Sequence, residues 1–171
     1  MLRQSENAPS KYLQAARVAA SLGYLTLNQR DAVGLVMSAG DETFWTPASS
    51  SNAQLVRMLE ILATRLPAST DALQPCLKAL LDRGERRGMV ILISDLMFEP
   101  EPVQRELGRL AAEGQEILVF QMRDPDEEEF PFNRWVEFRD LEGINHHRID
   151  TVPLKRIYRE EYQALLQEWR S

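Results

Sequence analysis

The sequence predicts an α/β fold, a three-layer and mostly parallel sheet with an antiparallel edge strand. In Met89-Val90-Ile91-Leu92-Ile93, five consecutive apolar residues leave no face for solvent. Such a run is typical of a parallel strand covered by helices on both faces. A second buried run spans residues 116–122. Segments with apolar residues at helical spacing alternate with these runs, which is the pattern of a sheet flanked by helices.

The amino-terminal half predicts a helix, a hairpin and two further helices. Ser10 is placed to cap a helix that runs to about Gln29. Residues 33–37 and 43–46 flank a Gly40-Asp41 turn and predict a β-hairpin. A serine-rich loop over 47–52 then precedes a helix. The apolar stripe of that helix comprises Leu55, Met58, Leu59, Leu62 and Leu66.

The next predicted helix has Cys76 on its apolar face, and Pro75 must lie in its first turn because a proline deeper inside would break it. After the 88–95 strand, Pro100 and Pro102 open another helix. Its inward face is predicted to comprise Val103, Leu107, Leu110 and Ala111.

Beyond the 116–122 strand the pattern becomes more polar. Residues 124–131 predict an acidic loop, and the charge run 126–129 is typical of a solvated segment, with a partner surface as the alternative. Residues 134–138 and 146–150 predict a pair of strands. The adjacent His146 and His147 point to opposite faces of a strand, so they are poorly placed to chelate one metal ion. An amphipathic helix from about Pro153 to Trp169 closes the chain.

Composition limits the classes of function. A chain of 171 residues predicts a single domain over 1–171, with residues 1–9 polar and flexible. The 26 acidic against 20 basic residues give a net charge of −6, which disfavours nucleic acid as a partner. Cys76 is the only cysteine, and no apolar run approaches the ~20 residues of a membrane span. We therefore expect a cytoplasmic protein without a membrane segment.

Asp95 is the first residue to suspect of chemistry. It stands at the carboxyl end of the 88–95 strand, and ligands of open α/β sheets bind at the carboxyl ends of strands. The alternative is a carboxylate that only caps the turn. A metal-dependent hydrolase or nuclease would use Asp95 with Asp41 or Asp124. A phosphoacceptor role for Asp95 is a third hypothesis, although the sequence places no lysine where that chemistry needs one.

Several segments together resemble a known family. They are Asn28-Gln29-Arg30-Asp31-Ala32-Val33-Gly34-Leu35, Ser69-Thr70-Asp71-Ala72-Leu73, the 86–96 segment that ends in Ile93-Ser94-Asp95-Leu96, and Arg139-Asp140-Leu141-Glu142-Gly143. In this order they resemble the bacterial domain-of-unknown-function family fifty-eight, a branch of the von Willebrand factor A-like fold. The resemblance extends from Lys11 to the final helix.

The resemblance implies part of a metal-ion-dependent adhesion site. Members of the fold hold a divalent cation with an Asp-x-Ser-x-Ser motif after the first strand, a threonine and an aspartate. Thr70 and Asp95 match the last two elements, and Thr70 is also placed to cap a helix. The first motif does not occur in this sequence. Because Mg²⁺ and Mn²⁺ want several oxygen ligands, we expect weak binding or none.

The same resemblance implies that the fold here is truncated at the amino terminus. The strand before the first motif would lie between residues 33–37 and 89–94. Without it, those strands meet directly, leave a gap or accept a strand from elsewhere, so we expect a marginally stable or self-associating chain. By resemblance, the function is a non-enzymatic protein-interaction module that works with a MoxR-type AAA+ ATPase in assembling or maturing other proteins.

Overall fold

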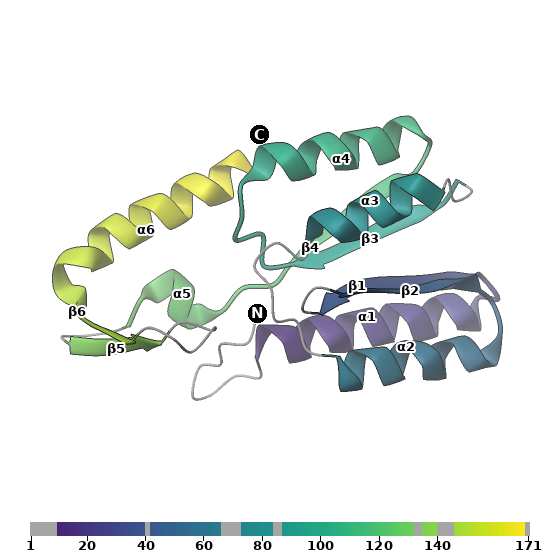
Figure 1. Cartoon of the computed structure of the whole chain (residues 1–171), viewed down its shortest axis with the longest axis horizontal. Helices are drawn as coiled ribbons and strands as arrows, with labels where there is room; N and C mark the ends of the chain where they lie inside the picture. The colour runs from purple at the N-terminus through teal and green to yellow at the C-terminus, as the bar shows by residue number, and fades with distance from the viewer. Residues whose placement is uncertain are drawn as a thin grey trace.

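The computed structural model of this chain describes residues 10–39, 42–65, 73–83, 87–131, 135–139 and 146–169 (Figure 1). The fold is α/β, with helices packed against small sheets. The elements in chain order are α1 (Lys11–Asn28), β1 (Val33–Ala39), β2 (Glu42–Ser49), α2 (Asn52–Thr64), α3 (Leu73–Arg83), β3 (Met89–Ser94), α4 (Pro100–Ala112), β4 (Glu116–Gln121), α5 (Pro125–Glu129), β5 (Trp135–Arg139), β6 (His146–Asp150) and α6 (Thr151–Glu168).

The predicted hairpin is confirmed as the antiparallel pair β1–β2, with Val36 opposite Trp45. The pairing shifts register between Val33 and Leu35. A Cβ atom at Gly34 would lie 2.8 Å from the carbonyl oxygen of Thr46, so this close approach requires glycine. Helices α1 and α2 contact each other and both contact β1. The amino-terminal part is therefore a hairpin supported by two helices.

Helix α2 is attached to the hairpin by a buried polar side chain. Gln54 is 1% exposed, and its Nε2 donates to the carbonyl oxygens of Val33, at 2.8 Å, and Pro47, at 2.9 Å. The sequence predicted Leu59 on the buried stripe, but Leu59 is 44% exposed. That expectation was wrong for Leu59 because the buried face of the helix is formed by Gln54 together with the predicted Met58 and Leu62.

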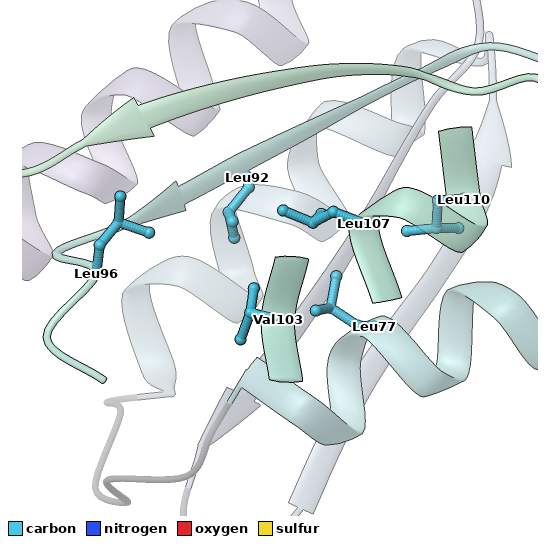
Figure 2. Close-up of a cluster of buried hydrophobic side chains, with 6 residues drawn as sticks. All are labelled: Leu77, Leu92, Leu96, Val103, Leu107 and Leu110. Atoms are coloured by element: carbon cyan, nitrogen blue, oxygen red, sulfur yellow. The ribbon is translucent and has the colours of Figure 1, made fainter. Parts of the chain in front are cut away.

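The predicted parallel pair is confirmed between β3 and β4, where Ile91 lies opposite Leu118. Helix α4 covers this pair from one side, and α3 contacts α4. Figure 2 shows the side chains that gather between them. The buried core consists of Leu77, Leu92, Leu96, Val103, Leu107 and Leu110. Cys76 is also buried, and burial raises the pKa of its thiol to about 11, which keeps the thiol protonated at neutral pH.

The β1–β2 and β3–β4 pairs form separate sheets within the described residues. In Figure 1, β1 and β3 run in the same direction. Helix α1 contacts both β1 and β3, and α3 also contacts β1, so helices rather than strand hydrogen bonds join the two halves. Of the three outcomes expected from the sequence, direct pairing of β1 with β3 does not occur.

The carboxyl-terminal part contains the predicted antiparallel pair β5–β6, with Glu137 opposite Arg148. Helix α6 follows β6 and ends near α4 (Figure 1). Gln104 of α4 donates from Nε2 to the carbonyl oxygen of Glu168, at 3.1 Å. Phe98 and Trp169 meet edge to face, with ring centroids 5.5 Å apart. No helix in the described segments is long and apolar enough to cross a membrane.

Four expectations about elements need correction. Strand β2 continues through Pro47 to Ser49, where the sequence predicted a loop. The acidic loop contains the short helix α5, which begins with proline at its first position. Ala111 is exposed at the end of α4. Leu118 and Val119 of β4 are about two-fifths exposed, because β4 pairs only with β3 in the described part of the sheet.

Candidate functional site

The candidate site begins with a buried lysine at the start of α1. Ser10 caps this helix, because its side-chain oxygen accepts a hydrogen bond from the backbone N–H of Leu13 at 3.2 Å. The next residue, Lys11, is only 3% exposed. A lysine ammonium is almost never buried to this degree unless it is paired with opposite charge. Lys11 therefore needs carboxylate partners.

Two carboxylates from distant segments provide that charge. The Nζ atom of Lys11 donates to Asp95 Oδ2 at 3.0 Å and to Glu127 Oε1 at 2.6 Å. The side chains of Asp95 and Glu127 are 15% and 12% exposed. We call these three residues the Lys11 cluster. The cluster joins the amino end of α1 to the carboxyl end of β3 and to α5.

The Lys11 cluster is charged at neutral pH. Burial by itself lowers the pKa of the Lys11 amino group, because desolvation disfavours the ammonium form. The hydrogen bonds and charges of Glu127 and Asp95 outweigh that effect and raise the pKa above the ordinary value of 10.5. A protonated lysine thus lies between two partly buried carboxyl groups.

The backbone turns sharply just after Asp95. Leu96 adopts a left-handed conformation, with φ of 56°, and is buried. Such a conformation is uncommon for a branched, bulky residue and persists only when the surroundings hold it. Ser94 accepts a hydrogen bond from the Leu96 N–H at 3.2 Å, and Trp169 Nε1 donates to the Leu96 carbonyl at 3.1 Å. These contacts fix the direction in which Asp95 leaves the strand.

Helix α5 positions the second carboxylate. Asp124 is 2% exposed and caps α5, since its Oδ1 accepts a hydrogen bond from the backbone N–H of Asp126 at 2.8 Å. At the other end, Phe130 has φ of 44°, and its ring lies 4.7 Å from that of Tyr158 on α6. Glu127 therefore projects from a short helix that is held at both ends.

Comparison with known proteins identifies the family. The family model described as "Protein of unknown function DUF58" matches residues 3–171. The chain belongs to the DUF58 family. Searches of curated proteins and of solved structures each give no match.

Of the two residues predicted to bind metal in this DUF58 chain, the structure describes Asp95 but not Thr70. Asp95 lies at the carboxyl edge of the β3–β4 sheet, as expected, and its carboxylate contacts Lys11. Thr70 and Asp41 lie outside the described residues. Asp124, the other acid of the hydrolase hypothesis, serves as the cap of α5.

The described residues at this edge do not fit a divalent cation. No group of three or more histidine, cysteine, aspartate or glutamate side chains in the described segments is arranged to hold one. A cation bound to Asp95 would also face the ammonium of Lys11 at close range, and like charges repel strongly in a partly buried site. Weak binding of Mg²⁺ or Mn²⁺ remains a prediction.

Sequence reasoning missed Lys11 and Glu127. The phosphoacceptor hypothesis was discounted for want of a well-placed lysine, yet Lys11 contacts Asp95. A signal existed, because Lys11 lies four residues before Ala15 and so shares the buried face of α1. Glu127 belongs to a charge run that predicted a solvated loop, and composition does not distinguish the member of that run that contacts Lys11.

Proposed function

We propose that this DUF58 chain is a non-enzymatic protein-interaction domain with a von Willebrand factor A-like arrangement. We further propose that it works with a MoxR-type AAA+ ATPase in assembling or maturing other proteins. The observation that carries the proposal is the Lys11 cluster, in which the strand-end carboxylate of Asp95 is neutralised by a buried lysine. Contacts of α1 with both β1 and β3, and of α3 with β1, support a sheet covered on two sides.

The cluster favours binding over catalysis. A hydrolase of the kind considered would need Asp95 and Asp124 to hold a metal ion or to activate water. Here Asp95 contacts the ammonium of Lys11, and Asp124 caps a helix. Both carboxylates therefore stabilise the edge of the sheet. A rigid edge, with fixed side chains around it, is what a recognition surface requires.

The surface that this edge presents is acidic. Glu127 points inward to Lys11, while Glu129, two residues later, is exposed on the same short helix. Because Asp124 and Phe130 hold α5 at its two ends, Glu129 is displayed from a fixed backbone. A basic surface on the ATPase would complement it, and charged groups at the rim of an interface act mainly through the association rate.

The proposal is tested with purified chain and a purified MoxR-type ATPase, by biolayer interferometry in the presence of ATP. We expect Glu129→Lys to weaken binding at least tenfold. Glu101→Lys is the matched control, since Glu101 is exposed in the first turn of α4, which lies away from α5. Loss of binding in both variants, or in neither, would show that α5 is not the contact surface. Absence of binding by the unmodified chain would refute the partnership.

A separate measurement distinguishes the hydrolase alternative. Calorimetry with Mn²⁺ should detect no binding, or binding only at millimolar concentration, because the described donor set is small. Micromolar affinity that disappears in Asp95→Ala would instead show a complete metal site and revive the hydrolase hypothesis.

A further inference from the structure

One side of helix α6 carries a concentration of positive charge. The buried residues of this helix are Thr151, Tyr162 and Leu166, and they define the side that faces the rest of the chain. The next stripe around the helix borders a shallow surface hollow of about 590 Å³. It comprises Val152, Lys155, Arg156, Arg159, Glu160 and Gln163. We call these six residues the α6 flank.

The α6 flank has more cations than carboxylates. Arg156 Nη1 donates a hydrogen bond to Glu160 Oε1 at 3.0 Å, so these two charges are paired within the helix. Lys155 and Arg159 have no ion-pair partner among the described residues. They are four residues apart, about one turn of the helix, and like charges at this spacing repel each other. An anionic partner would remove that repulsion.

The α6 flank is open to solvent and elongated. Val152 is 63% exposed, and the side chains of Arg156 and Glu160 are 79% and 60% exposed. Because water solvates these charges, the flank needs no other part of the chain to cover it. From Val152 to Gln163 the helix rises about 16 Å, at about 1.5 Å per residue. That length exceeds a single phosphate or carboxylate group and suits a short segment of polypeptide.

The composition of α6 disfavours a membrane or a nucleic acid as the partner of this flank. A helix that lies in a membrane interface needs large apolar residues next to its basic ones. Leu154 and Ile157 are 37% and 49% exposed, but they lie on roughly the opposite side of the helix from Arg159. Val152 is the one apolar residue of the flank. The net charge of −6 opposes the approach of DNA or RNA, whereas a short acidic segment with few charges interacts mainly with the nearby cations.

We propose that the α6 flank binds an acidic helical segment of another protein, in which carboxylates one turn apart pair with Lys155 and Arg159. Charge complementarity identifies this occupant, and a helix repeats its side chains at the same interval as α6 does. Val152 adds an apolar contact at one end. A second copy of this chain is a poorer donor, because acidic side chains of its α5 already form ion pairs within the chain. The proposal does not rest on the ATPase partnership, which concerns Glu129.

The test uses fluorescein-labelled helical peptides rich in alanine and glutamine. The acidic peptide has three glutamates, one at every fourth position, so they share one side of the helix. The control peptide has the same composition with its glutamates at consecutive positions, so they point to different sides. Fluorescence anisotropy at low salt should show saturable binding of the acidic peptide, at least fivefold tighter than that of the control and weaker in high salt. Equal binding of the two peptides, or no saturable binding of the acidic one at millimolar concentration, would overturn the proposal.

Charge reversal locates the site. The variant Lys155→Glu, Arg159→Glu should bind the acidic peptide at least tenfold more weakly and should gain binding of a matched peptide with lysine in place of glutamate. Arg17→Glu, Arg57→Glu is the control, because it changes the net charge equally at exposed positions of α1 and α2, which lie away from α6 (Figure 1). It should weaken binding less than twofold. Equal losses in the two variants would show a general effect of net charge and overturn the proposal.

A neutral variant guards against loss of the fold. Lys155→Gln, Arg159→Gln replaces both cations with a residue that forms helix well, so circular dichroism should be unchanged. Binding of the acidic peptide should fall at least threefold. Unaltered binding to this variant would overturn the proposal.

Two further measurements distinguish other occupants of the α6 flank. Vesicles of phosphatidylserine and phosphatidylcholine should not retain the chain in a sedimentation assay. Retention that the charge-reversed variant loses would assign the flank to a membrane and overturn the proposal. Light scattering measures self-association, and dimerisation that the charge-reversed variant loses would make the occupant a second copy of this chain, so the proposal would be wrong as to source.

Discussion

At the scale of single residues, we expect the stability of the fold to depend strongly on Lys11. Lys11→Met keeps an unbranched apolar side chain and removes the charge, which leaves the partly buried Asp95 and Glu127 without this partner. Removal of one partner from a buried ion pair costs about 3–5 kcal/mol. We expect a loss of that size in the free energy of unfolding, measured by urea denaturation at pH 7. Lys78→Met, at an exposed position of α3, should change it by less than about 0.5 kcal/mol.

A further variant tests whether the loss of stability comes from unpaired charge or from lost packing. The triple variant Lys11→Met, Asp95→Asn, Glu127→Gln should recover part of the stability, because it no longer leaves unpaired charge in the site. Stability of the unmodified chain should also depend on pH in a defined direction. The folded-state pKa of Lys11 is raised, so its contribution is complete below about pH 10.4 and is lost as pH rises through the folded pKa. Lys11→Met should lack this alkaline loss. Both proteins share the effect of Cys76, because burial raises the pKa of its thiol from 9.0 to about 11 and stability therefore falls as pH rises through that range.

The sequence could place Asp95 but could not show its partners. A carboxylate directly after an apolar strand follows from local pattern alone, and its position at the sheet edge is confirmed. Asp95 lies 84 residues from Lys11 along the chain, and Glu127 lies 116 residues from Lys11. Contacts of this kind depend on how the helices dock, which no local period encodes.

At the scale of elements, the attachment of α2 to the hairpin depends on one amide. Gln54→Leu preserves size but leaves the carbonyls of Val33 and Pro47 without this donor, and each buried unsatisfied group costs about 1–3 kcal/mol. We expect a lower melting temperature by calorimetry. Gln104→Leu removes an exposed side chain that also donates to a backbone carbonyl, and should have little effect. Similar losses in both variants would mean that burial of Gln54 is unimportant.

Most elements were predictable because their signals are local. The caps and prolines located α1, α3 and α4, and apolar runs located β1, β3 and β4. The extension of β2 through Pro47 was missed, since proline usually ends a strand. The burial of Gln54 in place of Leu59 was missed for a different reason. A helical stripe defines a broad apolar face, and the positions of α1 and of the hairpin decide which part of it is covered.

At the scale of the whole molecule, the described residues form three two-stranded sheets, and helices join β1–β2 to β3–β4. Helix α1 contacts both β1 and β3, and the Lys11 cluster fastens its first turn to the end of β3. The cavity between the strands means that this junction gains little from sheet hydrogen bonds. The sequence predicted parallel strands but not how they would be spaced, because neighbour choice in a sheet is a global property. The local pattern predicted the strands. The resemblance to a family predicted a gap between residues 33–37 and 89–94 as one of three outcomes.

This architecture predicts a chain of low stability. We expect the isolated chain to melt below about 60 °C, within the ordinary range of mesophilic domains or under it, because β1 and β3 each pair along one edge only within the described residues. An apolar six-residue strand fused ahead of residue 1 should raise the melting temperature by several degrees. Tethering makes the strand's effective concentration millimolar, so the fusion should stabilise more than the same six-residue strand added as a free peptide at micromolar concentration. Calorimetry with light scattering gives both the melting temperature and the mass. A sharp monomeric transition above about 60 °C without the added strand would mean that helices α1 and α3 hold the β1–β2 and β3–β4 sheets together well enough, and that the second edges of β1 and β3 belong to a self-sufficient fold.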